Sequence, residues 1–143
     1  MLVPDLESLL PHRAPILMLE RVIDLEPGVR GTGVRVFRSD DACFAGHFPG
    51  QPILPGVLTI EALAQTLMVV LGAAEESRPG AAGAPPVGYL QRVESMSFLR
   101  PIVPGDEVRF AVEVEKRLQK IRRDLFPVVD EKGIHAFRTE VLQ

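Results

Sequence analysis

One histidine and one glutamate in a short stretch of this chain are of the types, and at the spacing, that could perform acid–base chemistry. The stretch GHFPGQPILPGVLTIEALAQ, residues 46–65, places His47 in a loop rich in proline and glycine and Glu61 in an otherwise apolar segment. An ionised carboxylate is costly to desolvate unless it is paired or made neutral. Glu61 therefore needs either access to solvent or a functional explanation.

The backbone between these two side chains suggests a third component, an amide that binds an oxyanion. Pro55 and Gly56 directly precede a segment typical of a helix, and the first N–H groups of a helix have no partner within it. Gln65 follows Glu61 by four residues and shares its helix face. A histidine, a buried carboxylate and such an amide are the groups needed to remove a proton next to a carbonyl.

The same residues also have a purely structural interpretation. A single histidine after a glycine is most often satisfied by a backbone hydrogen bond, and a glutamate in an apolar helix often extends its carboxylate to solvent. Composition and spacing alone leave both interpretations of His47 and Glu61 open.

The other candidate groups favour structural roles. His12, in the sequence PHRAP, is expected to hydrogen-bond within a turn, and His135 to lie on the face of a strand. Cys43 has no polarising neighbour, which favours a small apolar packing role. No Asp or Glu stands at ligand spacing around His47, so we predict no metal site.

The overall composition is that of an ordinary soluble globular protein. A chain of 143 residues fits a single domain, residues 1–143, that can bury about 70% of the surface exposed by the unfolded chain. The net charge of −3 argues against nucleic acid as a partner, because nucleic-acid-binding domains are normally basic. The single cysteine excludes an internal disulfide and suits a reducing cytosol.

The sequence pattern predicts a cytoplasmic protein without a membrane span. The N-terminal MLVPDLESLL has no cationic region ahead of an apolar core, so we expect no signal peptide. The longest apolar run, residues 57–71, contains Glu61 and Gln65 and is too short to cross a bilayer.

The elements that must position the candidate residues begin with a short helix and two strands. The helix is expected over residues 4–10, and the strands over residues 16–28, closed by a Pro-Gly turn, and 29–41. Gly31 and Gly33 weaken the start of the second strand. Residues 42–55 are too rich in proline and glycine for regular structure.

A buried helix and further strands complete the predicted fold. The helix starts near Gly56 or Val57 and is apolar on nearly every face through Leu71, so the rest of the fold must wrap it. A breaker-rich loop follows it. Strands are then expected over residues 89–103 and 107–118, and a hairpin over 124–142 with its turn at 130–133. This order predicts an α+β fold, a curved antiparallel sheet around one central helix.

Three blocks of the sequence resemble one enzyme family. LPHRAPILMLERV, FAGHFPGQPILPGVLTIEALAQ and FLRPIVPGDEV, in this order and spacing, are similar to the 3-hydroxyacyl-acyl carrier protein dehydratases of type II fatty acid synthesis, the FabZ family. The resemblance implies the hot-dog fold, in which a curved antiparallel sheet wraps a long helix. It also implies a homodimer or an assembly of dimers.

The resemblance further implies a reaction and a role for each site residue. The reaction is the reversible dehydration of a (3R)-3-hydroxyacyl thioester on acyl carrier protein to the trans-2-enoyl thioester, without a cofactor. His47 and Glu61 would form the catalytic pair, and Gly56 would offer its N–H to the thioester carbonyl. The carbonyl of Ile53 would orient the His47 imidazole, and Gln65 would contact the substrate.

Some positions depart from the family pattern, and other functions stay open. Ala14 replaces an aromatic residue, Ile16 a phenylalanine and Glu20 an aspartate, which leaves the preferred acyl chain length open. The basic run at 115–123 is either a solvated face or, with Arg92 and Arg100, a docking surface for an acidic carrier protein. The alternative functions are a hot-dog acyl thioesterase and a non-catalytic subunit that binds acyl carrier protein.

Overall fold

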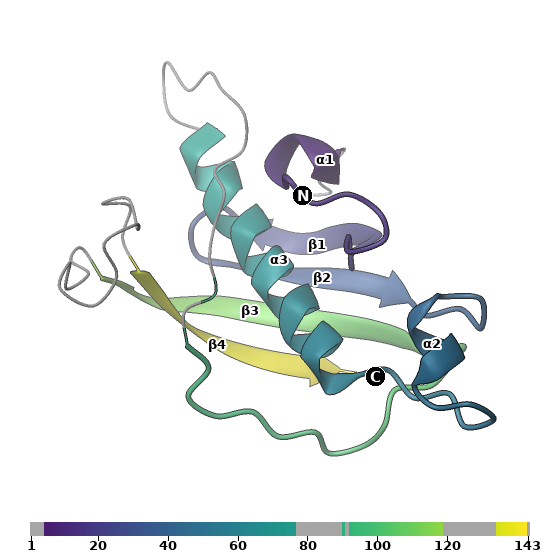
Figure 1. Ribbon diagram of the computed structural model, residues 1–143. Coiled ribbons are helices and arrows are strands. Elements are labelled where there is room, and N and C mark those ends of the chain that lie inside the picture. Colours follow the sequence, from purple (N-terminus) through teal and green to yellow (C-terminus); the bar gives the residue numbers. More distant parts are fainter. Residues whose placement is uncertain (1–4, 77–89, 91, 119–133, 143) are drawn as a thin grey trace, which may run out of the picture.

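The computed structural model describes residues 5–76, 90, 92–118 and 134–142. In chain order the elements are α1 (Leu6–Leu9), β1 (Arg21–Glu26), β2 (Arg30–Val36), α2 (Cys43–Gly46), α3 (Gly56–Glu76), β3 (Glu107–Leu118) and β4 (Ile134–Leu142). A long helix packed against an antiparallel sheet confirms the predicted α+β class (Figure 1).

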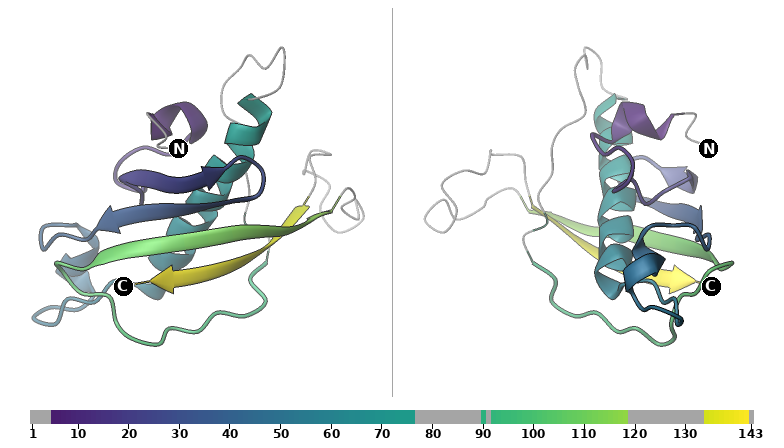
Figure 2. Two further views of the ribbon diagram at one scale, coloured as in Figure 1. Left: turned by 180° about the vertical axis from the view of Figure 1, so that it is seen from behind. Right: turned by 45° about the vertical axis from the view of Figure 1, so that its right-hand side comes forward.

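The sheet has the strand order β1-β2-β3-β4, and each neighbouring pair is antiparallel. β3 is the long strand that pairs with β2 along one edge and with β4 along the other. Both figures show α3 crossing one face of this sheet, with α1 near the C-terminal end of the helix (Figures 1 and 2). The core fills the space between α3 and the sheet, and includes Val22, Val34, Phe37, Val69, Val70, Val108 and Phe110.

Two glycines of β2 explain how closely the helix approaches the sheet. A Cβ atom at Gly33 would lie 2.2 Å from Thr66 Oγ1, and one at Gly31 would lie 2.9 Å from Val70 Cγ2. Both contacts would be far inside van der Waals distance. The glycines that weaken β2 as a strand are therefore the positions where α3 needs room.

The central helix is longer than predicted and is not covered on every side. It begins at Gly56, as expected, but continues through Glu76. Side chains on one face are partly exposed in the single chain: Val57, Ile60, Glu61, Ala64, Met68 and Leu71. The sheet covers only the opposite face, so the prediction of complete burial is wrong for one chain.

By length and composition alone, α3 could cross a membrane. The helix extends beyond the apolar run of residues 57–71 from which the sequence predicts no membrane span. However, 56% of its most apolar 18-residue window is buried within the protein. The helix is thus the core element on which the sheet packs.

The first predicted strand is shorter than expected. Residues 13–16 form a turn, in which the N–H groups of Ile16 and Leu17 both donate to the Arg13 carbonyl at 3.1 Å. The strand starts only at Arg21. The predicted Pro-Gly turn is confirmed, and the N–H of Gly28, at φ +74°, donates to the Val70 carbonyl at 2.8 Å.

The region between β2 and α3 contains regular structure, contrary to prediction. Residues 43–46 form the single helical turn α2, and Phe44 anchors it in the core. The Phe44 ring meets Phe37 edge to face, with the ring centres 6.5 Å apart. Burial of one aromatic side chain outweighs the low helix propensity of the surrounding glycines and prolines.

The strand predicted over residues 89–103 is not present at the described positions 90 and 92–103. This segment follows an extended path beyond β4 without pairing to the sheet (Figures 1 and 2). Several of its apolar side chains are exposed: Leu90, Val93, Phe98 and Leu99. Apolar and β-branched residues give strand propensity, but a strand also requires a partner edge.

The two C-terminal strands agree in part with prediction. β3 matches the expected strand 107–118, and β4 forms the second arm of the expected hairpin, with His135 within it. β4 pairs with β3. The first arm of the hairpin and the predicted breaker-rich loop lie outside the described residues, except for the start of the loop, which belongs to α3.

Candidate active site

His47 follows α2 in a loop that closes on itself. The N–H of Ile53 donates to the His47 carbonyl at 2.8 Å, and Phe48 and Gln51 exchange two backbone hydrogen bonds. The imidazole stacks on the Phe48 ring, with centres 4.0 Å apart. Proline and glycine permit this tight turn, and the backbone bonds fix the orientation of the ring.

The His47 ring has a defined tautomer. Its Nδ1 lies 2.7 Å from the carbonyl oxygen of Ile53. Because a carbonyl oxygen only accepts, Nδ1 must carry the hydrogen and Nε2 keeps a lone pair when the ring is neutral. The side chain is therefore arranged as a base that acts through Nε2.

The start of α3 supplies the backbone amide that the sequence predicts. The N–H of Gly56 has no acceptor among the residues that the structure describes. The Phe98 ring covers this point closely, because a Cβ at Gly56 would lie 2.8 Å from its Cζ. Only glycine leaves room for the ring against the helix start. The amide and an exposed aromatic ring thus lie side by side.

Glu61 lies one turn further along α3, and two side chains contact the same one of its oxygens. Oε1 accepts a hydrogen bond from Gln65 Nε2 at 2.7 Å and lies 3.3 Å from His12 Nε2. The Glu61 side chain is 29% exposed. The carboxyl group is therefore neither sealed in the core nor free in solvent.

Gln65 links this site to the loop before β1. Its side chain is fully buried; Oε1 accepts from Met18 N–H and Nε2 donates to the Ile16 carbonyl, both at 2.8 Å. With the bond to Glu61, the amide group is fully engaged by the protein. Contact between Gln65 and substrate stays a prediction; the observed contacts are all internal.

His12 is the residue that sequence reasoning missed. We expected it to hydrogen-bond within its own turn, but its ring faces Glu61, 49 positions away in the chain. The PHRAP sequence contains no signal of this contact, because only the packing of the loop on α3 creates it.

In the structure, the predicted site residues thus lie in two separate groups. His47 and Ile53 form one, and Glu61 and Gln65, with His12, form the other. Within the described part of the chain, no hydrogen bond or ion pair joins His47 to Glu61.

Neither Cys43 nor a metal cluster adds chemistry among the described residues. Burial raises the pKa of the Cys43 thiol, and the nearby Asp41 carboxylate raises it further. Cys43 also packs against the core, as predicted. Over residues 5–76, 90, 92–118 and 134–142, no group of three or more His, Cys, Asp or Glu side chains is placed to hold a metal ion.

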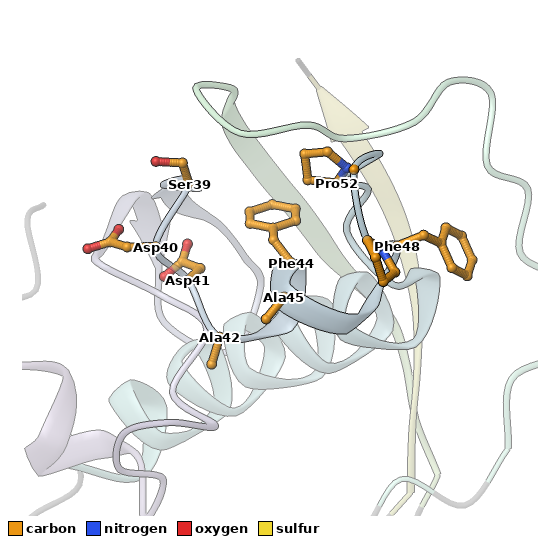
Figure 3. A pocket seen from close by; sticks show the side chains of 10 residues that line it. Ser39, Asp40, Asp41, Ala42, Phe44, Ala45, Phe48 and Pro52 are labelled. Carbon is orange, nitrogen blue, oxygen red and sulfur yellow. The ribbon is translucent and has the colours of Figure 1, made fainter.

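A shallow cavity of about 380 Å³ lies beside α2. Its walls come from residues 39–42, from α2 and from the loop at Phe48 and Pro52 (Figure 3). Neither His47 nor Glu61 lines it, so it is separate from both catalytic candidates.

Only part of the predicted basic docking surface lies among the described residues. Arg92 forms an ion pair with its neighbour Glu94. Residues 119–123 of the basic run lie outside the described residues. The proposal of a docking surface there stays a prediction.

Comparison with known proteins identifies clear similarities. Residues 10–137 match the family model of the FabA-like domain. The chain is 37% identical over 113 residues to 3-hydroxyacyl-acyl-carrier-protein dehydratase FabZ of Geotalea uraniireducens, covering 78% of this chain and 74% of the relative. The protein of the same name from Anaeromyxobacter sp. is 40% identical over 121 residues, covering 85% and 75%. That from Acidiphilium cryptum is 44% identical over 107 residues, covering 75% and 62%.

Proposed function

Because the chain belongs to the FabZ family of 3-hydroxyacyl-acyl-carrier-protein dehydratases, we propose that it reversibly dehydrates (3R)-3-hydroxyacyl-acyl carrier protein to the trans-2-enoyl thioester. The proposed context is type II fatty acid biosynthesis in the cytoplasm. The observation that carries the proposal is the bond from His47 Nδ1 to the Ile53 carbonyl, which leaves Nε2 available as a base.

In the proposed reaction, His47 Nε2 removes the proton from C2 of the substrate, next to the thioester carbonyl. The electron pair of that C–H bond is first delocalised onto the thioester carbonyl as enolate-like charge, and it then forms the C2–C3 double bond as the C3–O bond breaks. Gly56 N–H donates to the thioester oxygen while it carries negative charge, and protonated Glu61 donates its proton to the departing hydroxyl. Water leaves, and the imidazolium and carboxylate exchange the proton afterwards, so no cofactor is required.

We further propose that each site is shared by two chains. Within the described part of one chain no hydrogen bond or ion pair joins His47 to Glu61, and Glu61 lies on the partly exposed face of α3. A second copy packed on this face would cover its apolar side chains and bring His47 of the partner subunit toward Glu61. A homodimer, alone or within an assembly of dimers, is therefore the proposed active unit.

One assay separates this function from its alternatives. Purified protein is mixed with a 3-hydroxyacyl thioester of acyl carrier protein, and both enoyl absorbance and free thiol are followed. A dehydratase gives conjugated enoyl product, a thioesterase gives free thiol, and a non-catalytic binding subunit gives neither. Only the first outcome supports the proposal.

A further inference from the structure

The contact between His12 and Glu61 gives His12 a role that the predicted catalytic set does not include. His12 Nε2 lies 3.3 Å from Glu61 Oε1, and the two side chains are 21% and 29% exposed. We propose that His12 is a positioning residue that, together with Gln65, fixes the carboxyl group of Glu61 so that its other oxygen, Oε2, carries the reactive proton. This inference rests on the proposed function, in which Glu61 is the acid.

The hydrogen-bond donors around Glu61 determine which of its two carboxyl oxygens carries the proton. The Nε2 of Gln65 can only donate, so Glu61 Oε1 accepts at 2.7 Å. A proton on Oε1 would face that amide hydrogen. Protonated Glu61 therefore keeps its hydrogen on Oε2, which has no partner among the described residues.

The His12 ring places its Nε2 3.3 Å from the same oxygen. Its Nδ1 is buried and has no hydrogen-bond partner within the described ranges. A buried N–H without a partner is rare in proteins, whereas an unpaired acceptor is less so. The neutral tautomer with its hydrogen on Nε2 thus fits both nitrogens, because it places the hydrogen on the nitrogen that lies 3.3 Å from Glu61 Oε1.

The loop that carries His12 is held independently of the imidazole. Arg13 Nη1 donates to the carbonyls of Leu10 and His12 at 2.9 and 2.8 Å. Further along the loop, Gln65 binds both Ile16 and Met18. Since these bonds use the backbone, replacement of the His12 side chain should leave the loop in place.

The test compares three variants of His12. His12→Leu removes the donor. In His12→Asn the side-chain amide lies near the position of Nδ1, and the side chain is too short to reach Glu61. In His12→Gln an N–H lies near the position of Nε2. We expect His12→Leu and His12→Asn to lower kcat by about 10- to 100-fold with little change in KM, since a misplaced catalytic group loses rate rather than binding. His12→Gln should recover kcat to within roughly threefold of wild type.

A double variant distinguishes positioning from stability. In the Glu61→Gln background, adding His12→Leu should cause no further loss of kcat, because the group that His12 positions is already absent. The control is Leu6→Ala, which weakens packing of the same N-terminal segment without touching Glu61. Its folded fraction should turn over at the wild-type rate.

The outcomes separate this inference from the proposed function. Near-normal turnover by Glu61→Gln would remove the proposed acid. If Glu61→Gln is inactive but His12→Leu keeps wild-type kcat, the role of His12 alone is wrong. Equal losses of kcat in His12→Asn and His12→Gln would also overturn the role of His12. These two variants provide the test if His12→Leu does not fold.

Discussion

The Nδ1 of His47 and the carbonyl oxygen of Ile53, six positions further along the chain, lie 2.7 Å apart, and the loop between them also closes through the backbone of the same two residues. One residue thus fixes the histidine backbone through its N–H and the imidazole through its carbonyl. The proposed base is thus oriented before substrate arrives, which would reduce the reorganisation needed in the reaction.

Removal of either proposed catalytic group should abolish dehydration without unfolding the protein. His47→Ala and Glu61→Gln each remove an acid or base, which typically contributes about 10²–10⁴ in rate. Neither side chain fills the core, since both are partly exposed. Enoyl formation measures the rate, and circular dichroism checks the fold. Near-normal turnover by either folded variant would refute its assignment.

Mixing these two inactive variants should restore activity if the site is shared between subunits. After dissociation and re-association, random pairing makes about half of the dimers mixed, and each mixed dimer contains one complete site. The ceiling is roughly a quarter of wild-type sites. Subunit exchange is verified by native mass spectrometry. Mixtures that exchange but stay inactive would show that His47 and Glu61 of the same chain act together.

Loss of the Gln65 amide should destabilise the fold as well as the site. Gln65→Leu leaves the buried N–H of Met18 without its partner, at about 1–3 kcal/mol, and also removes the bond to the part-buried carbonyl of Ile16. Chemical denaturation measures the free energy of unfolding. The matched control is Gln51→Leu, an exposed position, where a change below about 0.5 kcal/mol is expected. Equal effects at both positions would contradict the anchoring role.

An added methyl group on β2 should push the helix from the sheet. Gly33→Ala places Cβ 2.2 Å from Thr66 Oγ1, and overpacking of this kind costs about 1–3 kcal/mol. Gly46→Ala is the control, because its Cβ would meet nothing within 4 Å. Thermal unfolding compares the two. Adding Thr66→Ala should recover part of the stability that Gly33→Ala loses. If it recovers none, the strain does not arise at the contact with Thr66.

The Cys43 thiol should react slowly in the folded protein. Because burial raises its pKa, the reactive thiolate is scarcer near pH 8 than for an ordinary cysteine. Alkylation by iodoacetamide, followed by mass spectrometry, should be severalfold slower in buffer than in denaturant. A native rate that equals or exceeds the denatured rate would contradict this environment.

Local signals predicted much of the fold. The start of α3 follows from Pro55 and Gly56 before an apolar run, and β3 follows from its alternating valines. The end of α3 was harder to place, because Gly72 indicates a break. In the structure Gly72 packs against Leu9, where a Cβ would already lie 3.5 Å from the Leu9 side chain. A tertiary contact thus outweighs the local preference.

The site was predictable only where its parts are close in sequence. His47, Ile53 and Gly56 lie within ten residues, and the loop that joins them has a recognisable pattern. The His12 contact depends on how a distant loop folds onto α3, which no local pattern encodes. The same holds for Gln65: its helix face is evident from its spacing to Glu61, but its partners Ile16 and Met18 are not.

The way the loop before β1 is attached to α3 also bears on how this enzyme can evolve. Gln65 binds the carbonyl of Ile16 and the N–H of Met18, whereas the side chains of Ala14 and Ile16 are exposed. Substitutions at Ala14 and Ile16, both departures from the family pattern, therefore leave the hydrogen bonds that hold Glu61 intact. Selection can alter the surface of this loop while the carboxyl group of Glu61, the proposed acid, keeps its orientation.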